Sequence, residues 1–581
     1  MFFGFLAVII SFYQSHKDHY TSKEIDKEIY SISKEEVKRF LKKNSKNSVT
    51  DNQVDSMMSS DRLPEKITDR IYQRISNELG CDLKRDHHLS GMGDILHLSF
   101  NDSGKLKTIS GQIDHAGFVK LPIDEANSID LPLKYIYAKG LSLEEIKKKV
   151  NDKLKKQMNE EILKANLSND DRLDRENAII LIEEKYDNLD LSVTLTYENT
   201  IAKIKEKAHF YLYAKSNRPW TALLFNTYFF LGISLFAVFF IALQYVSEAA
   251  WSIVLKRVPE AVMKFLPIAS IFMLLIMIAS VMHFGGNHLY HWMAEGIMDE
   301  GSKYYDKIIA GKEAYLNATF FIARSVIYII GWIYFARKLR NLSLSEDKHG
   351  GINYYNKGIR TSAWFIVFFA VTSSMAAWDW IMSIDAHWFS TLFGWYIFAE
   401  WAAVGFTTIL LFTLYLKRKG HLQTVNDSHI HDLGKWIFAF SLVWTYMWFS
   451  QFMLIWYSNI PEEVAYFTAR WEIPQYRFLF WFSMLINFLL PLIILMSRDA
   501  KRHNGRLIFV SIVILLGHWL NSYLLVAPGS LNVYGKIGFT EIGIGIGFIG
   551  MFLYVVMKSL SKVPLDVKNH PFLDESKHLH T

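Results

Sequence analysis

Long apolar runs occupy most of the chain after Ala222, and they constrain its fold more than any other feature. Runs of 16 to 26 predominantly apolar residues alternate there with short polar loops. A helix of that length crosses a bilayer core of ~30 Å, because each residue adds about 1.5 Å. The runs predict nine membrane helices, over Ala222–Val246, Phe265–Phe284, Phe320–Phe335, Ala363–Ile384, Thr391–Leu416, Trp436–Ile460, Phe478–Met496, Leu507–Val526 and Ile537–Met557.

The first residues predict a tenth membrane helix. Met1–Tyr13 is apolar and lacks both the basic start and the small-residue cleavage site of a signal peptide. We interpret it as a retained helix, shortened if the start codon is misplaced. The expected fold class is an all-α polytopic membrane protein of about ten transmembrane helices, with an inserted extramembrane α+β domain.

That inserted domain is expected at residues 14–218, which are polar and rich in Lys, Glu and Asp. The pattern predicts helices over Ser33–Lys43 and Pro64–Leu79, paired strands in Met92–Pro122 around the Asn101–Gly104 turn, a helix from a Ser142–Glu145 capping box to about Leu167, and a strand over Leu189–Tyr197. The remainder divides into a membrane domain at 219–558 and a C-terminal tail at 559–581.

Cysteine and histidine usage excludes several redox sites and disfavours metal sites. Cys81 is the only cysteine, which excludes an intramolecular disulfide, an all-cysteine iron–sulfur cluster and a C-x-x-C-H haem attachment. His87 and His88 lack partner ligands at a useful spacing, and His288 and His291 lack a nearby carboxylate. Surface or interfacial hydrogen bonding is therefore favoured over metal binding at both pairs. We expect no metal, no catalytic residue and no covalently bound cofactor.

Charge indicates the orientation of the chain rather than a nucleic-acid partner. The 63 basic and 57 acidic residues leave a formal net charge of only +6. One set of alternating loops carries 21 Lys and Arg residues and the other carries 6. Because basic loops stay in the cytoplasm, both termini are expected inside, and residues 14–218 outside.

One stretch between two apolar runs, Trp378–Tyr396, combines four tryptophans with Asp379, Asp385 and His387. Tryptophan collects at the membrane–water interface, and an ionisable residue at membrane depth is a functional hypothesis by default. All three residues are candidates for a proton path. The alternative is that they are solvated loop residues, which suits Asp379 least because apolar residues follow it.

Five further ionisable residues lie within or at the ends of predicted spans. A charge at the helix centre costs about 3 kcal/mol, so such groups should face the bundle interior or water. Arg324 is expected to pair with Asp379 or Glu400 in a structural role. Glu400 is the best single candidate for a proton relay, and an inward-facing, hydrogen-bonded structural carboxylate is its alternative. The five residues, all candidates for a proton path, are His283, Arg324, Glu400, His518 and Glu541.

Two motifs within predicted spans have a structural and a functional interpretation. Trp444, Tyr446, Trp448 and Gln451 could line a quinone pocket, although aromatic residues in a large membrane bundle more often form its core. Gly545-x-Gly547-x-x-Gly550 matches a dinucleotide-binding pattern but lies in an apolar run without a preceding strand. We interpret it as a close helix-packing face.

From Asn217 to the C-terminus, the chain resembles the ActF subunits of alternative complex III, a quinol:cytochrome c oxidoreductase, and through them the NrfD-like, polysulfide-reductase-type membrane family. The resemblance covers roughly 365 of 581 residues. It is carried by Asn217–Trp220, Ile309–Lys312, Trp378–Asp385 with His387–Tyr396, Ser428–Leu433, Phe449–Tyr457, Asn459–Glu463, Asn569–Leu573 and Glu575–His578.

The resemblance implies two four-helix bundles plus two peripheral helices in the bacterial cytoplasmic membrane. It implies a subunit without its own redox centre that contributes a proton path, a quinone contact or a scaffold. Menaquinone is the implied quinone, and haem c and iron–sulfur clusters would lie in partner subunits. The implied partners are the NrfD-like ActC, the iron–sulfur ActB, the cytochrome subunits ActA and ActE, and ActD, together with lipids, and a terminal oxidase is a further candidate.

The chain departs from that family in its long outer region 14–218, which would suit docking to periplasmic subunits. Two other function classes remain open. A free-standing ion or solute transporter would require internal repeats and broken helices, and no convincing repeat is visible. A purely structural membrane anchor would make the buried charges structural.

Overall fold

The polar and apolar parts of the chain form two compact units in a computed structural model. A membrane unit contains residues 1–19 and 212–581, and an extramembrane unit contains residues 20–211. The structure describes residues 2–16, 22–44, 49–58, 65–78, 99–100, 106–108, 112–113, 118–122, 128–132, 200–302 and 305–580. The boundary predicted at residue 218 falls inside α8 (Thr200–Val246), because this helix begins well before its apolar part.

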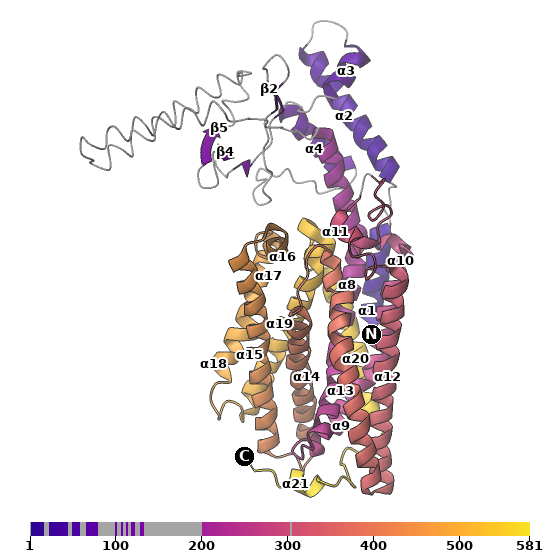
Figure 1. The fold of residues 1–581 in the computed structure, drawn as a ribbon, viewed down its shortest axis with the longest axis vertical. Coiled ribbons are helices and arrows are strands. Elements are labelled where there is room, and N and C mark those ends of the chain that lie inside the picture. Colours follow the sequence, from indigo (N-terminus) through magenta and orange to yellow (C-terminus); the bar gives the residue numbers. More distant parts are fainter. Residues whose placement is uncertain are drawn as a thin grey trace, which may run out of the picture. The chain divides into compact units, whose positions relative to one another are not determined.

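All nine predicted membrane helices are confirmed among the described residues. They are α8, α9–α10 within Ile253–Val281, α12 (Ala318–His349), α13 (Ile352–Trp380), α14 (Phe393–Arg418), α15 (Asp427–Ser458), α17–α18 within Pro474–Ile494, α19 (Asn504–Leu531) and α20 (Phe539–Leu560) (Figure 1). Their lengths and apolar composition indicate an all-α, multi-pass membrane protein.

The end of α13 differs from the prediction, which carried this span to Ile384. The helix stops at Trp380, and a 3₁₀ turn, η5 (Met382–Asp385), follows it. Asp379 is therefore in the last helical turn and fully buried, whereas Asp385 and His387 are in the connection to α14.

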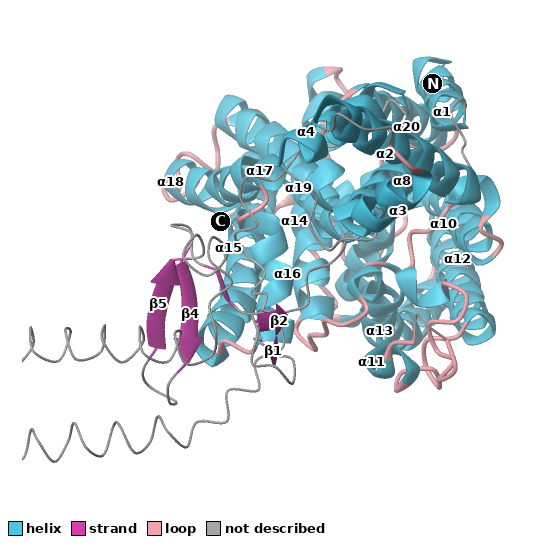
Figure 2. Ribbon diagram, turned by 90° about the horizontal axis from the view of Figure 1, so that it is seen from above, coloured by secondary structure: helices cyan, strands magenta, loops and turns pink. Residues whose placement is uncertain are grey.

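Helix α14 forms the centre of the membrane unit and packs against α13, α15 and α19 (Figure 2). It also meets α8 closely, because a Cβ added at Gly405 would lie 2.0 Å from the Phe236 ring, and one at Gly232 would lie 2.1 Å from Trp401. Most of its residues are buried, as expected for a helix that is apolar on nearly all sides. An ionisable side chain in the buried part of α14 must therefore find its partners inside the protein.

The N-terminal segment forms a helix, α1 (Phe2–His16), that packs along α20. A Cβ added at Gly547 would lie 2.6 Å from the Cα atom of Gly4, and one at Gly543 would lie 2.5 Å from the Ala7 Cβ. The interpretation of Gly547 as part of a close packing face is confirmed.

The C-terminal tail folds back on one end of the membrane unit and ends in α21 (Leu573–Lys577). The Ser576 hydroxyl donates to the Trp251 carbonyl at 3.1 Å, and Nε2 of His429 lies 3.1 Å from the Ser576 carbonyl. The tail thus bridges the connection after α8 and the first turn of α15.

The extramembrane unit contains α2 (Ser22–Asn44), α3 (Asp51–Met58) and α4 (Glu65–Glu78), so the two helices predicted at 33–43 and 64–79 are confirmed. Its described strands are β1 (Ser99–Phe100) paired with β2 (Leu106–Thr108), and β3 (Gln112–Ile113), β4 (Phe118–Pro122) and β5 (Ser128–Pro132) in a second antiparallel sheet. The elements predicted at 142–167 and 189–197, with His87, His88 and Cys81, lie outside the described residues, and the complete α+β domain stays a prediction.

Candidate functional site

Glu400 lies about two turns into α14 from its N-terminal end and is only 2% exposed. Its carboxylate accepts hydrogen bonds from the Asn521 amide and the Ser522 hydroxyl, both at 2.7 Å and both from α19. The Asn521 side-chain oxygen in turn accepts a hydrogen bond from the Tyr396 hydroxyl at 2.8 Å, one turn before Glu400 on α14. Of the residues that the structure describes, only neutral donors hold this carboxylate.

Glu400 is distinguished from the other buried acids by having no basic partner. Seven carboxylate side chains are buried among the described residues, and six of them lie within 4.0 Å of a Lys or Arg nitrogen. Glu400 is the seventh. An unpaired carboxylate at membrane depth is costly, and such residues mark proton or ion pathways.

Aromatic side chains and one histidine surround this carboxylate network. The Trp444 ring stacks on Tyr396 at 5.7 Å, and its edge meets the fully buried His518 ring at 5.0 Å. Neither ring nitrogen of His518 has a hydrogen-bond partner among the described residues, and the Tyr228 hydroxyl has none either. A buried polar atom without a hydrogen-bond partner costs about 1–3 kcal/mol of folding free energy. The His518 ring and the Tyr228 hydroxyl therefore have hydrogen-bonding capacity that the described side chains do not fill.

A pocket with an empty volume of about 400 Å³, including the space at its mouth, adjoins the network. Asn521 and Tyr396 lie on its wall, and Gln451 contributes a side-chain amide whose nitrogen has no partner among the described residues. The other lining residues are mostly aromatic or apolar, and come from α15, α17, α19 and α16 (Pro461–Trp471): Trp448, Tyr466, Phe467, Arg470, Phe480, Ser483, Met484, Leu524 and Leu525. An apolar pocket with a few convergent polar groups is typical of a small-molecule site.

The four quinone-contact candidates on α15 divide between two faces of the helix. Trp448 and Gln451 line the pocket, and Trp444 is fully buried beside Tyr396. Tyr446 does not line it and is 64% exposed. Helical geometry explains the difference, because positions i, i+4 and i+7 share a face whereas i+2 points away from them. Tyr446 is therefore removed from the candidate site.

Arg324 and Asp379 form a buried, bidentate ion pair between α12 and α13. The guanidinium donates to the two carboxylate oxygens at 3.0 and 2.8 Å, and the Tyr328 hydroxyl donates to the same carboxylate at 3.2 Å. Of the two partners expected for Arg324, the structure selects Asp379 rather than Glu400. This geometry favours a structural role for the pair, because a bidentate guanidinium is a strong and permanently charged partner.

Asp385 is paired with a residue of α16, and His387 with the residue that precedes α11 (Lys307–Ala310). Asp385 accepts from Arg470 at 3.1 Å, and Arg470 also donates to the carbonyls of Leu524 and Leu525. His387 is 2.6 Å from Asp306, which caps α11. Partial burial raises the pKa of Asp306, but hydrogen bonds from the Ile309 amide and from His387 outweigh this effect and lower it.

The remaining two proton-path candidates also lie away from Glu400. The Glu541 carboxylate accepts two hydrogen bonds from Arg218 at 2.8 Å and caps the start of α20. His283 lies in a left-handed turn after α10, and its ring stacks on His288 at 5.0 Å. Among the described candidates, only His518 belongs to the network around Glu400: it shares a face of α19 with Asn521 and Ser522, and its ring meets Trp444, which stacks on Tyr396.

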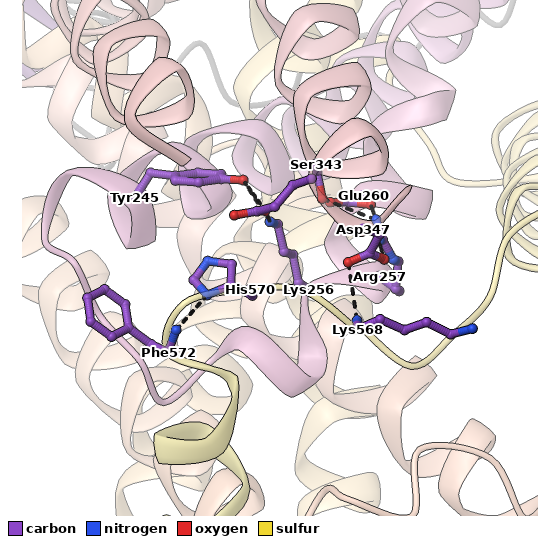
Figure 3. A network of polar contacts seen from close by, with 10 residues as sticks. Tyr245, Lys256, Arg257, Glu260, Ser343, Asp347, Lys568, His570 and Phe572 are labelled. Carbon is purple, nitrogen blue, oxygen red and sulfur yellow. Dashed lines mark hydrogen bonds and ion pairs between the residues drawn. The ribbon is translucent and has the colours of Figure 1, made fainter. Parts of the chain in front are cut away.

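A second polar cluster lies at the end of the membrane unit that the tail covers (Figure 3). Lys256 donates to Glu346 at 2.9 Å and to the Tyr245 hydroxyl at 2.7 Å. Arg257 pairs with Glu260 at 2.5 Å and also with Asp347. Each acid of this cluster is paired with one of its two cations, which indicates an anchor for the loops and the tail.

Asn521, Ser522, Tyr228 and Arg470 belong to the site but were not singled out by the sequence. Asn521 and Ser522 follow His518 at helical spacing within an apolar run, and that pattern could have revealed them.

Among the described residues, no group of three or more His, Cys, Asp and Glu side chains is placed to hold a metal ion. No protein-family model matches the chain, and no curated protein is significantly similar to it in sequence.

Proposed function

We propose that the chain is an NrfD-like membrane subunit of a menaquinol:cytochrome c oxidoreductase in the bacterial cytoplasmic membrane. It would hold no redox centre of its own and would work beside iron–sulfur and cytochrome subunits. The resemblance of residues 217–581 to that family supports the assignment, as do the nine membrane helices. The finer architecture of two four-helix bundles and the cytoplasmic placement of both termini are parts of this proposal.

Within that complex, we assign the subunit a proton-exchanging carboxylate next to a quinone contact. The observation that carries this assignment is Glu400, the one buried acid without a basic partner among the described residues. Asn521 touches Glu400 and also lines the pocket. The Gln451 amide can donate to a carbonyl or hydroxyl oxygen in that pocket, and Trp448 with Phe480 supplies an apolar wall for a ring. When such a ligand loses a proton, Glu400 would accept it, and when the ligand gains a proton, Glu400 would supply it.

The assignment is tested by replacing Glu400 with Gln in the intact complex. The variant keeps the size and the hydrogen-bonding capacity of the side chain but cannot exchange a proton. We expect the rate of quinol oxidation to fall at least about a hundredfold, or proton release per electron to fall, because a proton-transfer group typically contributes about 10²–10⁴-fold. Glu472→Gln is the matched control, because Glu472 is an exposed acid after α16.

Unchanged turnover and unchanged proton release in Glu400→Gln, together with the same result for Asp379→Asn, would instead support a structural anchor.

The subunit assignment itself is tested by extracting the tagged chain in mild detergent. Haem absorption and co-purifying iron–sulfur and cytochrome subunits are expected. A colourless, solitary protein would contradict the proposal and favour a transporter.

A further inference from the structure

Four basic side chains gather where the connection between α18 (Leu490–Ile494) and α19 meets the start of α15. They are Lys435, Arg498, Lys501 and Arg502. The connection packs tightly on α15, because a Cβ added at Gly434 would lie 3.2 Å from both the Cβ and the carbonyl oxygen of Lys501. Gly434 thus allows Lys501 to approach the helix next to Lys435.

Electrostatic interactions confirm that these cations are close together. Lys435, Arg498 and Arg502 all lie within electrostatic range of the His431 ring. Burial and repulsion by Lys435 lower the pKa of Lys501. The Lys501 ammonium also donates to the Met496 carbonyl at 3.0 Å and lies 4.7 Å from the Phe438 ring, which fixes its direction.

Among the described residues, Arg498 is the cation of this cluster that is left exposed without an acidic partner. Asp432 pairs with Lys435 at 2.6 Å, and Asp499 is the other acid in the connection. The positive charge of Arg498 is therefore available at this surface, whereas the acids around Lys256 are all paired.

Exposed apolar side chains lie immediately beside this charge. Ile493 and Met496 are each 64% exposed at the end of α18, and Phe509 and Ile512 on α19 are 53% and 48% exposed. These residues belong to or directly adjoin membrane-crossing helices, so their exposed faces meet lipid. A soluble anion would use only the charges, whereas a phospholipid would use the charges and the apolar wall together.

We propose that the cluster of Lys435, Arg498, Lys501 and Arg502 binds the phosphate of an anionic phospholipid, whose acyl chains lie along Ile493, Met496, Phe509 and Ile512. Basic pockets between membrane helices are suited to such headgroups, because each basic residue near the membrane surface adds to the attraction for anionic lipid. The occupant is a bilayer lipid, and its binding does not depend on the function assigned to Glu400.

The test compares dioleoyl phosphatidylglycerol with dioleoyl phosphatidylcholine on the delipidated, detergent-solubilised full chain by native mass spectrometry. The unaltered chain should retain phosphatidylglycerol preferentially. In the Arg498→Gln variant, the ratio of bound phosphatidylglycerol to bound phosphatidylcholine should be roughly fivefold lower. In the Arg498→Gln/Lys435→Gln double variant, this ratio should be roughly 25-fold lower. The Lys558→Gln/Lys562→Gln control removes two exposed charges at the end of α20 and should keep the preference.

Two outcomes would overturn the proposal. One is an Arg498→Gln variant with the same preference for phosphatidylglycerol as the unaltered chain. The other is inorganic phosphate at millimolar concentration displacing the lipid completely, because the apolar wall would then contribute nothing. The single variant keeps the Asp432–Lys435 pair intact, so its result does not depend on the double variant folding.

Discussion

At the scale of single residues, partners separate the buried acids of this protein into two kinds. Asp379 has a guanidinium partner at 2.8 Å, whereas Glu400 accepts only from an amide and a hydroxyl. Both acids lie in apolar sequence surroundings, so composition does not distinguish them. The pairing depends on which helices are neighbours, because Arg324 faces Asp379 across α12 and α13.

Replacing Asp379 with Asn should destabilise the protein by about 3–5 kcal/mol, because the Arg324 guanidinium then keeps its charge in a buried site without an acid partner. Thermal unfolding in detergent measures this loss. Asp385→Asn is the comparison, since Asp385 is partly exposed and Arg470 keeps its bonds to two carbonyls. Equal unfolding temperatures for the two variants would contradict the structural role of the Arg324–Asp379 pair.

At the scale of elements, small residues decide how the N-terminal helix attaches. Gly4 of α1 and Gly547 of α20 are in direct backbone contact. In a bilayer, such close approach replaces the hydrophobic driving force that would act in water. The glycine pattern is therefore a packing signal and not a phosphate-binding one.

We expect Gly547→Leu to destabilise the protein by about 1–3 kcal/mol, because a side chain there must push α1 away from α20. Ile549→Leu, at a position that is 49% exposed on the same helix, should leave the unfolding temperature unchanged. The interpretation fails if both variants unfold at the same temperature as the unaltered chain.

The attachment of the C-terminal tail should depend on pH through His570. Burial and the nearby Lys256 charge lower the pKa of His570 from 6.5 to about 3. Because a detached tail binds the proton more readily, the attachment is at full strength above pH 6.5 and weakens as the pH falls toward 3, by at most ~1.4 kcal/mol per pH unit.

Hydrogen exchange over residues 561–580, corrected for the intrinsic effect of pH, should therefore speed up between pH 7.5 and pH 5.5. His570→Gln cannot titrate and should remove that dependence. A pH dependence that persists in the variant would assign the effect to another group.

At the scale of the whole molecule, loop charge predicts an orientation that the helix arrangement does not itself determine. In a Cys81→Ser background, a cysteine at Lys307 should react with a membrane-impermeant maleimide in intact spheroplasts. A cysteine at Lys562 should react only after permeabilisation. Labelling in the reverse order would place the tail outside and overturn the predicted topology.

The membrane helices follow from the amino-acid sequence alone, because about 20 consecutive apolar residues can satisfy their backbone groups in a bilayer only as a helix. The sequence also identified Glu400, His518, Trp448 and Gln451 as unusual residues for their surroundings. Which of these candidate residues contact one another became visible in the folded structure. It paired Arg324 with Asp379, placed Asn521 between Glu400 and the pocket, and turned Tyr446 away from that pocket. These contacts join residues up to 125 positions apart, and helical periodicity orders side chains along one helix but does not specify which helices pack together.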